Sequence, residues 1–190
     1  MGGARLAVVT GILVLSACGQ APGAGTSHDS AQASPNVASA TSAGSSQEAR
    51  CATSQLRFSL GKSAAATSNQ VRTINVANAS GPTCYLGGYP GVELLDGAGN
   101  HLQDAQRSTD SFFGSYAASH RVDLQPGAAT TFDLTFVSND PCTGGAAGQH
   151  GAALKITPPG DYDASTIAAQ LLVCPNTLVV HPVGSPTPSN

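Results

Sequence analysis

The stretch Gln55-Leu56-Arg57-Phe58-Ser59-Leu60 alternates between polar and apolar side chains. In a strand, successive side chains point to opposite faces, so Leu56, Phe58 and Leu60 share one face and the polar residues share the other. This pattern is typical of a strand that is buried on one side only. The stretch therefore predicts a β-sheet protein with a core on one face of the sheet.

Further runs of strand-forming residues follow, separated by turn signals rich in Gly and Pro. They occupy residues 71–78, 92–95, 101–102, 122–124, 131–137, 153–156 and 178–180. The loop Asp96-Gly97-Ala98-Gly99-Asn100 has the composition of a hairpin connection. Ile167 and Leu171, four residues apart, suggest one short helix over Asp163–Leu171. The pattern predicts an antiparallel β-sandwich of about seven to eight strands, with a closed barrel as the alternative.

The N-terminus has the pattern of an export signal. Arg5 precedes a short apolar run from Leu6 to Leu15, which is too short to cross a bilayer as a helix. The run ends in Leu15-Ser16-Ala17-Cys18, which resembles the bacterial lipobox. This resemblance implies a lipoprotein signal peptide over residues 1–17 and a lipidated Cys18 that holds the chain at the extracytoplasmic face of the cell membrane. An ordinary secretory signal is the alternative.

The composition after Cys18 is that of a linker. Of the 32 residues from Gly19 to Arg50, 19 are Ala, Ser or Gly, and Val37 is the only larger aliphatic residue. Such a segment buries too little apolar surface to offset its ordering entropy. Residues 18–50 are therefore predicted to be a lipidated, disordered tether, residues 51–182 the folded domain, and residues 183–190 a disordered tail.

Four cysteines remain once Cys18 is assigned to lipid, and an even number in an exported domain implies two disulfides. Three pairings are possible. Cys51–Cys84 and Cys142–Cys174 are favoured because each of these cysteines lies just outside a predicted strand. A Cys/His metal site is the alternative, but no two cysteines have the close spacing of known zinc sites, so no metal and no cofactor are expected.

Motifs for catalysis or nucleic-acid binding are not found in the predicted domain. It contains no Gly-x-Ser-x-Gly turn, and the eight Lys and Arg of the chain are scattered singly, with a net charge of −3. The Asp161-x-Asp163 pair and Asp96 lie in turns, where carboxylates accept hydrogen bonds from backbone amides. The histidines are isolated from one another: His101, His120, His150 and His181.

One aromatic segment is a candidate interaction site. Between Gln103 and His120 the chain carries Phe112, Phe113 and Tyr116 among small and polar residues. Two adjacent aromatic side chains cannot both point to one face of a strand, so in a loop at least one ring is available to contact a partner. The favoured interpretation is nevertheless that these rings cap the end of the sandwich core.

Several short motifs together resemble a known family. They are Cys84-Tyr85-Leu86-Gly87-Gly88-Tyr89-Pro90-Gly91-Val92, the preceding Asn75-Val76-Ala77-Asn78 and the later Leu124-Gln125-Pro126-Gly127. The region from Cys51 to Pro182 is similar to the actinobacterial secreted lipoprotein family known as domain of unknown function 4232. The resemblance implies an immunoglobulin-like sandwich and an envelope location, and it carries no established activity.

The resulting hypothesis is a noncatalytic binding or structural module presented by its lipid and tether to a wall polymer, a lipid or an envelope protein. Nucleic acid is not an expected partner. One alternative is an extracytoplasmic enzyme whose site is assembled from distant residues such as His101, His120 and Asp123. Another is metal or redox handling by the cysteines.

Overall fold

The computed structural model describes residues 48–188, and these form an all-β domain with two short 3-10 turns, Thr53–Gln55 and Thr143–Gly145. The predicted signal peptide, lipidated Cys18 and tether up to residue 47 lie outside the described residues. Within the described part of the chain, no helix is long and apolar enough to cross a membrane.

The first sheet has five strands in the order β1-β2-β10-β13-β6. Their bounds are Leu56–Ala66 (β1), Asn69–Asn78 (β2), Ala129–Val137 (β10), Val179–Val180 (β13) and Gln106–Arg107 (β6). All neighbours are antiparallel except β13 and β6. Leu56 and Phe58 are buried as the alternation predicts, whereas Leu60 is 38% exposed because it lies at the edge, just before a bulge in β1.

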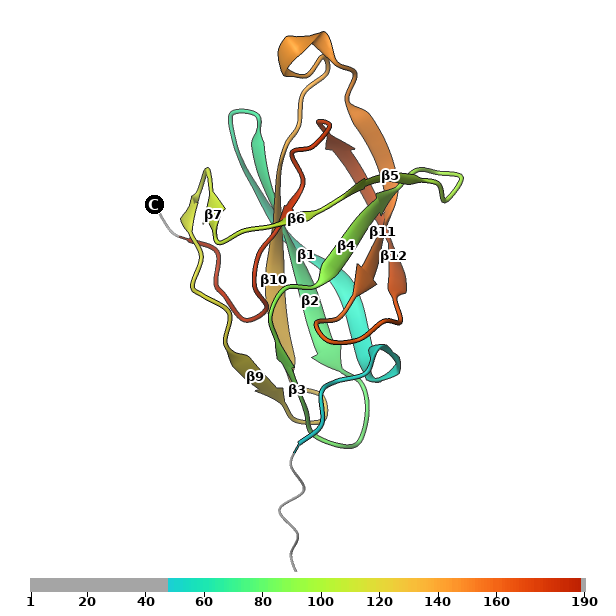
Figure 1. Cartoon of the computed structure of the whole chain (residues 1–190), viewed down its shortest axis with the longest axis vertical. Helices are drawn as coiled ribbons and strands as arrows, with labels where there is room; N and C mark the ends of the chain where they lie inside the picture. The colour runs from blue at the N-terminus through green and yellow to red at the C-terminus, as the bar shows by residue number, and fades with distance from the viewer. Residues whose placement is uncertain (1–47, 189–190) are drawn as a thin grey trace, which may run out of the picture. The chain divides into compact units, whose positions relative to one another are not determined.

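The second sheet has four antiparallel strands in the order β12-β11-β4-β5 (Figure 1). Their bounds are Ser165–Val173 (β12), Gln149–Thr157 (β11), Gly91–Leu95 (β4) and His101–Asp104 (β5). Two small sheets complete the domain. They pair β3 (Cys84–Gly87) with β9 (Arg121–Leu124), and β7 (Asp110–Ser111) with β8 (Gly114–Ser115).

One hydrophobic core fills the space between the two large sheets. The first sheet contributes Ile74, Phe132 and Leu134, and the second contributes Leu94 and Leu154, all of them with no exposed surface. These residues alternate with outward-facing ones along their strands, as the sandwich architecture requires. The predicted antiparallel β-sandwich is therefore confirmed. The described residues form thirteen strands, more than predicted. Strands of only two residues such as β6, β7 and β8 leave no periodic signal, and β12 lies where a helix was predicted.

The helix predicted over Asp163–Leu171 is wrong, since β12 occupies this region. A spacing of four residues returns a side chain to the same face in a strand as well as in a helix. Ala169, Leu171 and Val173 are all buried at intervals of two, which is the strand period.

Both predicted disulfides are present. Cys51 is bonded to Cys84, and Cys142 is bonded to Cys174. The first bond lies where the chain enters the domain, because the Cys51 amide donates to the Tyr85 carbonyl in β3. The Tyr85 amide in turn donates to the Ala49 carbonyl. Ordered structure therefore begins before Cys51, which corrects the predicted tether boundary at residue 50.

The C-terminal boundary is also corrected. Residues 183–188, predicted to be disordered, lie against the domain: Val183 has no exposed surface and Ser185 is almost fully buried. The Gly184 amide donates to the carbonyl of Thr131, and the Ser185 hydroxyl donates to the carbonyl of Ala117. We call residues 183–188 the C-terminal segment. The backbone of this segment forms a hydrogen bond with β10, an interaction that its polar, Pro-rich composition does not predict.

Candidate functional site

The segment that carries the predicted aromatic residues covers the outer face of the five-stranded sheet. After β5 the chain leaves the second sheet and joins the first as β6, and it then forms the β7–β8 hairpin (Figure 1). We call residues 105–120 the crossover segment. Leu134 and Val180 are register partners and both point into the core, so Thr135 and its partner Val179 point to the opposite face, toward the crossover segment.

Phe112 and Phe113 form the tip of the β7–β8 hairpin. Ser111 pairs with Gly114, so the two phenylalanines are the whole loop between the strands. The Ser111 hydroxyl donates to the Gly114 carbonyl at 2.8 Å and accepts from the Phe113 amide at 3.1 Å, and Gly114 has a φ of 115°. Glycine adopts this left-handed conformation without steric cost. Polar contacts and glycine therefore hold the tip.

The two aromatic rings at the tip have different environments. Phe112 is 61% exposed, whereas Phe113 is half-buried. Their ring centroids lie 5.6 Å apart with an interplanar angle of 85°, an edge-to-face arrangement. The sequence expectation of at least one exposed ring in this loop is met by Phe112.

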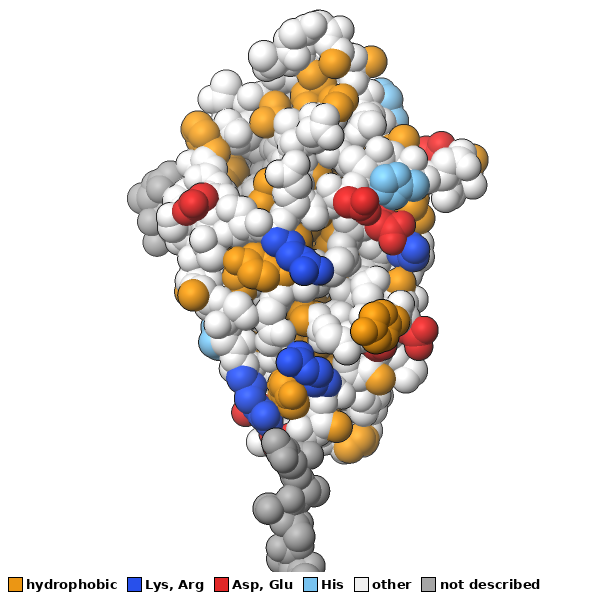
Figure 2. Space-filling model, in the orientation of Figure 1, with side chains coloured by type: hydrophobic (Ala, Val, Ile, Leu, Met, Phe, Trp, Pro, Cys, Tyr) orange, Lys and Arg blue, Asp and Glu red, His pale blue; other side chains and the backbone are white. Residues whose placement is uncertain are grey.

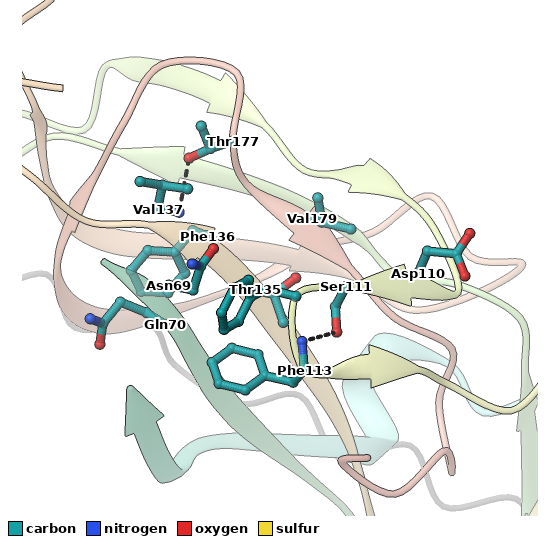
Figure 3. A pocket seen from close by; sticks show the side chains of 11 residues that line it. Asn69, Gln70, Asp110, Ser111, Phe113, Thr135, Phe136, Val137, Thr177 and Val179 are labelled. Carbon is teal, nitrogen blue, oxygen red and sulfur yellow. Dashed lines mark hydrogen bonds between the residues drawn. The ribbon is translucent and has the colours of Figure 1, made fainter. Parts of the chain in front are cut away.

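A cavity of about 150 Å³ lies beside this tip. Phe113, Phe136, Val137 and Val179 give it apolar walls, and the polar groups around it come from residues such as Thr177 (Figure 3). The Thr177 hydroxyl accepts from the Val137 amide at 3.1 Å. Pockets for drug-sized ligands occupy roughly 300 to 1,000 Å³. The cavity is therefore suited to one apolar side chain of a partner.

Tyr116 does not join the exposed tip, because its side chain is buried between the crossover segment and the first sheet. Its hydroxyl donates to Asp133 Oδ2 at 3.0 Å, and its ring stacks on the imidazole of His181 with centroids 3.7 Å apart. Burial, together with the negative charge of Asp133 and the hydrogen bond to it, raises the pKa of Tyr116. Tyr116 therefore stays protonated and donates to the carboxylate.

Asp133, only 2% exposed, is the centre of a partly buried polar cluster. Besides Tyr116, its carboxylate accepts hydrogen bonds from the hydroxyl of Thr73 at 2.7 Å and from that of Thr187. The hydroxyls compensate the carboxylate for its lost hydration. We call Thr73, Tyr116, Asp133, Thr135, His181 and Thr187 the Asp133 cluster. It joins the crossover segment and the C-terminal segment to the outer face of β2 and β10.

The protonation of His181 follows from its two partners. Nδ1 lies 2.8 Å from the Ser108 carbonyl, which only accepts, so Nδ1 carries the hydrogen. Nε2 lies 2.8 Å from Thr135 Oγ1 and accepts from this hydroxyl. Burial lowers the pKa of His181, although the Ser108 carbonyl and the charges of Asp133 and Asp110 oppose that shift. His181 is therefore neutral, and its two hydrogen bonds link the crossover segment to β10 of the first sheet.

The proposed enzyme residues His101, His120 and Asp123 have separate partners within residues 48–188. His101 Nε2 lies 3.1 Å from Asp104 Oδ1, and Asp123 pairs with Arg121. The contact of His120 is to the backbone carbonyl of Ala118 at 3.4 Å. Among residues 48–188, no hydrogen bond or ion pair joins any two of these three side chains.

Asp96 and Asp161, two of the three carboxylates expected to accept from turn amides, do so. Asp96 accepts hydrogen bonds from the side-chain amide of Asn100 and from the backbone amides of Asn100 and Ala98, and these bonds, the first of them most strongly, lower its pKa. Asp161 accepts from the backbone amide and hydroxyl of Thr53, and these hydrogen bonds lower its pKa to about 2.

The structure also reveals two buried polar residues, Asp133 and His181, whose role in the packing the sequence did not indicate. Asp133 occupies an outward position in β10 between the inward-facing Phe132 and Leu134, where a polar residue is ordinary. His181 was one of four isolated histidines in the sequence. Their burial depends on the crossover segment, whose docking leaves no periodic pattern.

These features define a class: a disulfide-bonded β-sandwich with an extra covering layer that presents an aromatic hairpin. The model of the family described as domain of unknown function (DUF4232) matches residues 51–184, and the chain belongs to this family. No curated protein matches the chain.

Proposed function

We propose that this protein is a lipid-anchored protein of the cell envelope and that its sandwich is a noncatalytic module that binds a partner protein. Support for the location comes from the lipobox-like Leu15-Ser16-Ala17-Cys18 and from the resemblance to actinobacterial secreted lipoproteins. Two disulfides are in keeping with an oxidising compartment outside the cytoplasm. The chain after Cys18 has the composition of a spacer.

The observation that carries the binding proposal is Phe112, exposed by 61% at the tip of a hairpin whose own fold does not need the ring. Aromatic side chains that pack into a partner dominate the energetics of many protein interfaces. The adjacent cavity of about 150 Å³ complements the ring by offering space for one apolar side chain of the partner. A protein with an apolar contact residue fits this pair of features better than a polymer chain that needs a long groove.

Crosslinking in cells tests the choice of partner. A photoreactive phenylalanine analogue replaces Phe112 in the full-length chain, and the matched control places it at Tyr162, which is 99% exposed in a different loop. We expect one protein adduct from position 112 that is absent from position 162. Binding of that protein, once purified, should then be weakened at least about tenfold by Phe112→Ser, as for an interface hot spot.

Other outcomes of this experiment contradict the proposal. Adducts from position 112 that contain only lipid or glycan would show that the hairpin contacts the membrane or the wall. The same adduct from both positions would show that Phe112 has no specific role.

The anchor is tested separately by the intact mass of the native protein, with and without reduction and alkylation. We expect a diacylglyceryl-modified Cys18 at the N-terminus and four alkylated thiols that appear only after reduction. An unmodified Cys18 would refute the anchor, and free thiols without reduction would favour metal or redox chemistry at the cysteines.

A further inference from the structure

A row of charged side chains runs across three strands of the second sheet. Lys155 of β11 is the register partner of Glu93 in β4, and Glu93 is the register partner of Asp104 in β5. Lys155 Nζ lies 2.8 Å from Glu93 Oε1. Figure 2 shows acidic, basic and histidine side chains gathered over this part of the surface. Like charges directly opposite on neighbouring strands are destabilising, so the Glu93–Asp104 pair needs compensation.

A bulge in β5 adds a histidine to this row. The register pairs Leu94 with Gln103 and Leu95 with His101, which leaves Leu102 as an extra residue. Residues three apart in a regular strand face opposite sides, but the extra residue brings His101 to the side of Asp104. As a result, His101 Nε2 lies 3.1 Å from Asp104 Oδ1.

The charges in this row are not balanced. Among the ion pairs of residues 48–188, Lys155 is the only lysine or arginine that pairs with either carboxylate, and it contacts Glu93 alone. The side chain of Asp104 is 72% exposed and that of His101 is 50% exposed, so both can reorient. Two carboxylates and an imidazole thus converge where only one of the carboxylates has a fixed cationic partner.

We propose that Glu93, His101 and Asp104 bind a divalent transition-metal cation, represented by Zn²⁺. One ligand atom from each residue lies within 4.8 Å of the others. Tetrahedral zinc, with bonds of about 2.1 Å, requires ligand atoms about 3.4 Å apart, a contraction that small side-chain rotations supply. Imidazole with carboxylates favours zinc or its transition-metal neighbours over Mg²⁺ and Ca²⁺, which prefer oxygen ligands.

The surroundings leave the metal accessible. Glu93 and Asp104 also line an open hollow of about 550 Å³, together with Gln106 and Arg107 of β6. With three protein ligands, the fourth position of a tetrahedral ion faces water. Sequence spacing did not indicate this site because Glu93 lies on a different strand from the other two ligands and the bulge is needed to align His101.

Calorimetric titration of the full-length, disulfide-bonded protein with ZnCl₂ tests the site. We expect His101→Ala to weaken one zinc-binding event by about tenfold or more, since even changes beyond the direct ligands cost that much. The matched control is His150→Ala, an exposed histidine in β11 of the same sheet, which should leave the affinity unchanged. Lys155→Met should strengthen binding, because Lys155 competes with the metal for Glu93.

Three results would overturn the proposal. One is equal zinc affinity in the wild type and His101→Ala. Another is Mg²⁺ or Ca²⁺ binding as tight as that of Zn²⁺, which would indicate only general attraction to carboxylates. The third is unchanged or weaker binding by Lys155→Met, which would exclude Glu93 as a ligand.

Discussion

At the scale of single residues, Asp133 shows how a buried charge is accommodated without a basic partner. Its carboxylate accepts from three hydroxyls, those of Thr73, Tyr116 and Thr187. Each hydroxyl belongs to a different segment, so one carboxylate links β2, the crossover segment and the C-terminal segment. Removal of an acceptor that serves three donors, one of them buried, costs more than removal of one donor.

This asymmetry gives the first prediction. We expect Asp133→Ala to lower the free energy of unfolding by about 3 kcal/mol, because it leaves the buried Tyr116 hydroxyl without an acceptor and also removes the hydrogen bonds from Thr73 and Thr187. Tyr116→Phe removes one donor and should cost about 1 to 2 kcal/mol. Urea denaturation of the two single variants and of the double variant measures the interaction free energy between Asp133 and Tyr116. Additive losses would show that the two residues do not interact in solution.

His181 gives a prediction about pH. Its pKa is lowered in the folded protein from the ordinary value of 6.5, so the unfolded chain binds the proton more readily. The stability that neutral His181 provides is complete above about pH 6.5 and is lost as the pH falls from there through the folded pKa. Thermal unfolding of the wild type between pH 7.5 and 5 should show this decline.

The control for this prediction is His181→Gln, which retains a donor and an acceptor but does not titrate in this range. Its stability should be lower at pH 7.5 and should change less between pH 7.5 and 5. Asp161 also loses stabilising interactions as the pH falls, but its pKa is lowered from the ordinary 3.8 to about 2 in the folded protein. That loss therefore occurs below pH 3.8, outside the range in which His181 titrates. Identical pH profiles for the wild type and His181→Gln would contradict the assignment.

At the scale of elements, the bulges decide which residues meet. The extra residue in β5 aligns His101 with Asp104, and a second irregularity lies between Gly151 and Ala153 in β11. At the latter, a Cβ on Gly151 would overlap with the side chain of Leu94, which is fully buried. Close packing between β11 and the side chain of Leu94 therefore requires glycine at position 151.

We expect Gly151→Ala to lower stability by about 1 to 3 kcal/mol, because the methyl group forces a displacement in a packed core. Gly81→Ala is the matched control, since no atom lies within 4 Å of the position that its methyl group would take. The midpoints of chemical denaturation for the two variants provide the comparison. Equal midpoints would mean that Leu94 relaxes freely, against the packing described above.

At the scale of the whole molecule, the two disulfides close consecutive parts of the chain. Cys51–Cys84 spans 33 residues and fixes the entry of the chain beside β3, whereas Cys142–Cys174 spans 32 residues and encloses both β11 and β12. Because the loops are similar in length, the chain-entropy contributions of the two bonds are similar.

We expect replacement of either cysteine pair by alanines to lower the free energy of unfolding by about 3 to 4 kcal/mol. Replacing both pairs should leave little of the stability of an ordinary domain. Guanidinium denaturation of the two paired variants measures each loss. A loss below about 1 kcal/mol for one pair would show that the entropy of that loop is already restricted in the unfolded chain.

The sequence predicted the sandwich and both disulfides because these depend on local signals, such as the alternation of Leu56 and Phe58. It did not predict the burial of Asp133 or His181, since these depend on how residues 105–120 dock onto the sheet. Nor did it predict that Glu93 and His101 converge, because their alignment depends on register and on one extra residue in β5. The features that the sequence did not predict thus depend on contacts between distant segments and on the register of neighbouring strands.

The architecture of the β7–β8 hairpin has an evolutionary consequence. Ser111, Gly114 and the buried Tyr116 hold the loop in place, while Phe112 at its apex contributes little to the fold. Under the binding role proposed above, selection for a new partner can change the apex without destabilising the domain, and related domains can diversify at this position while inheriting the same framework.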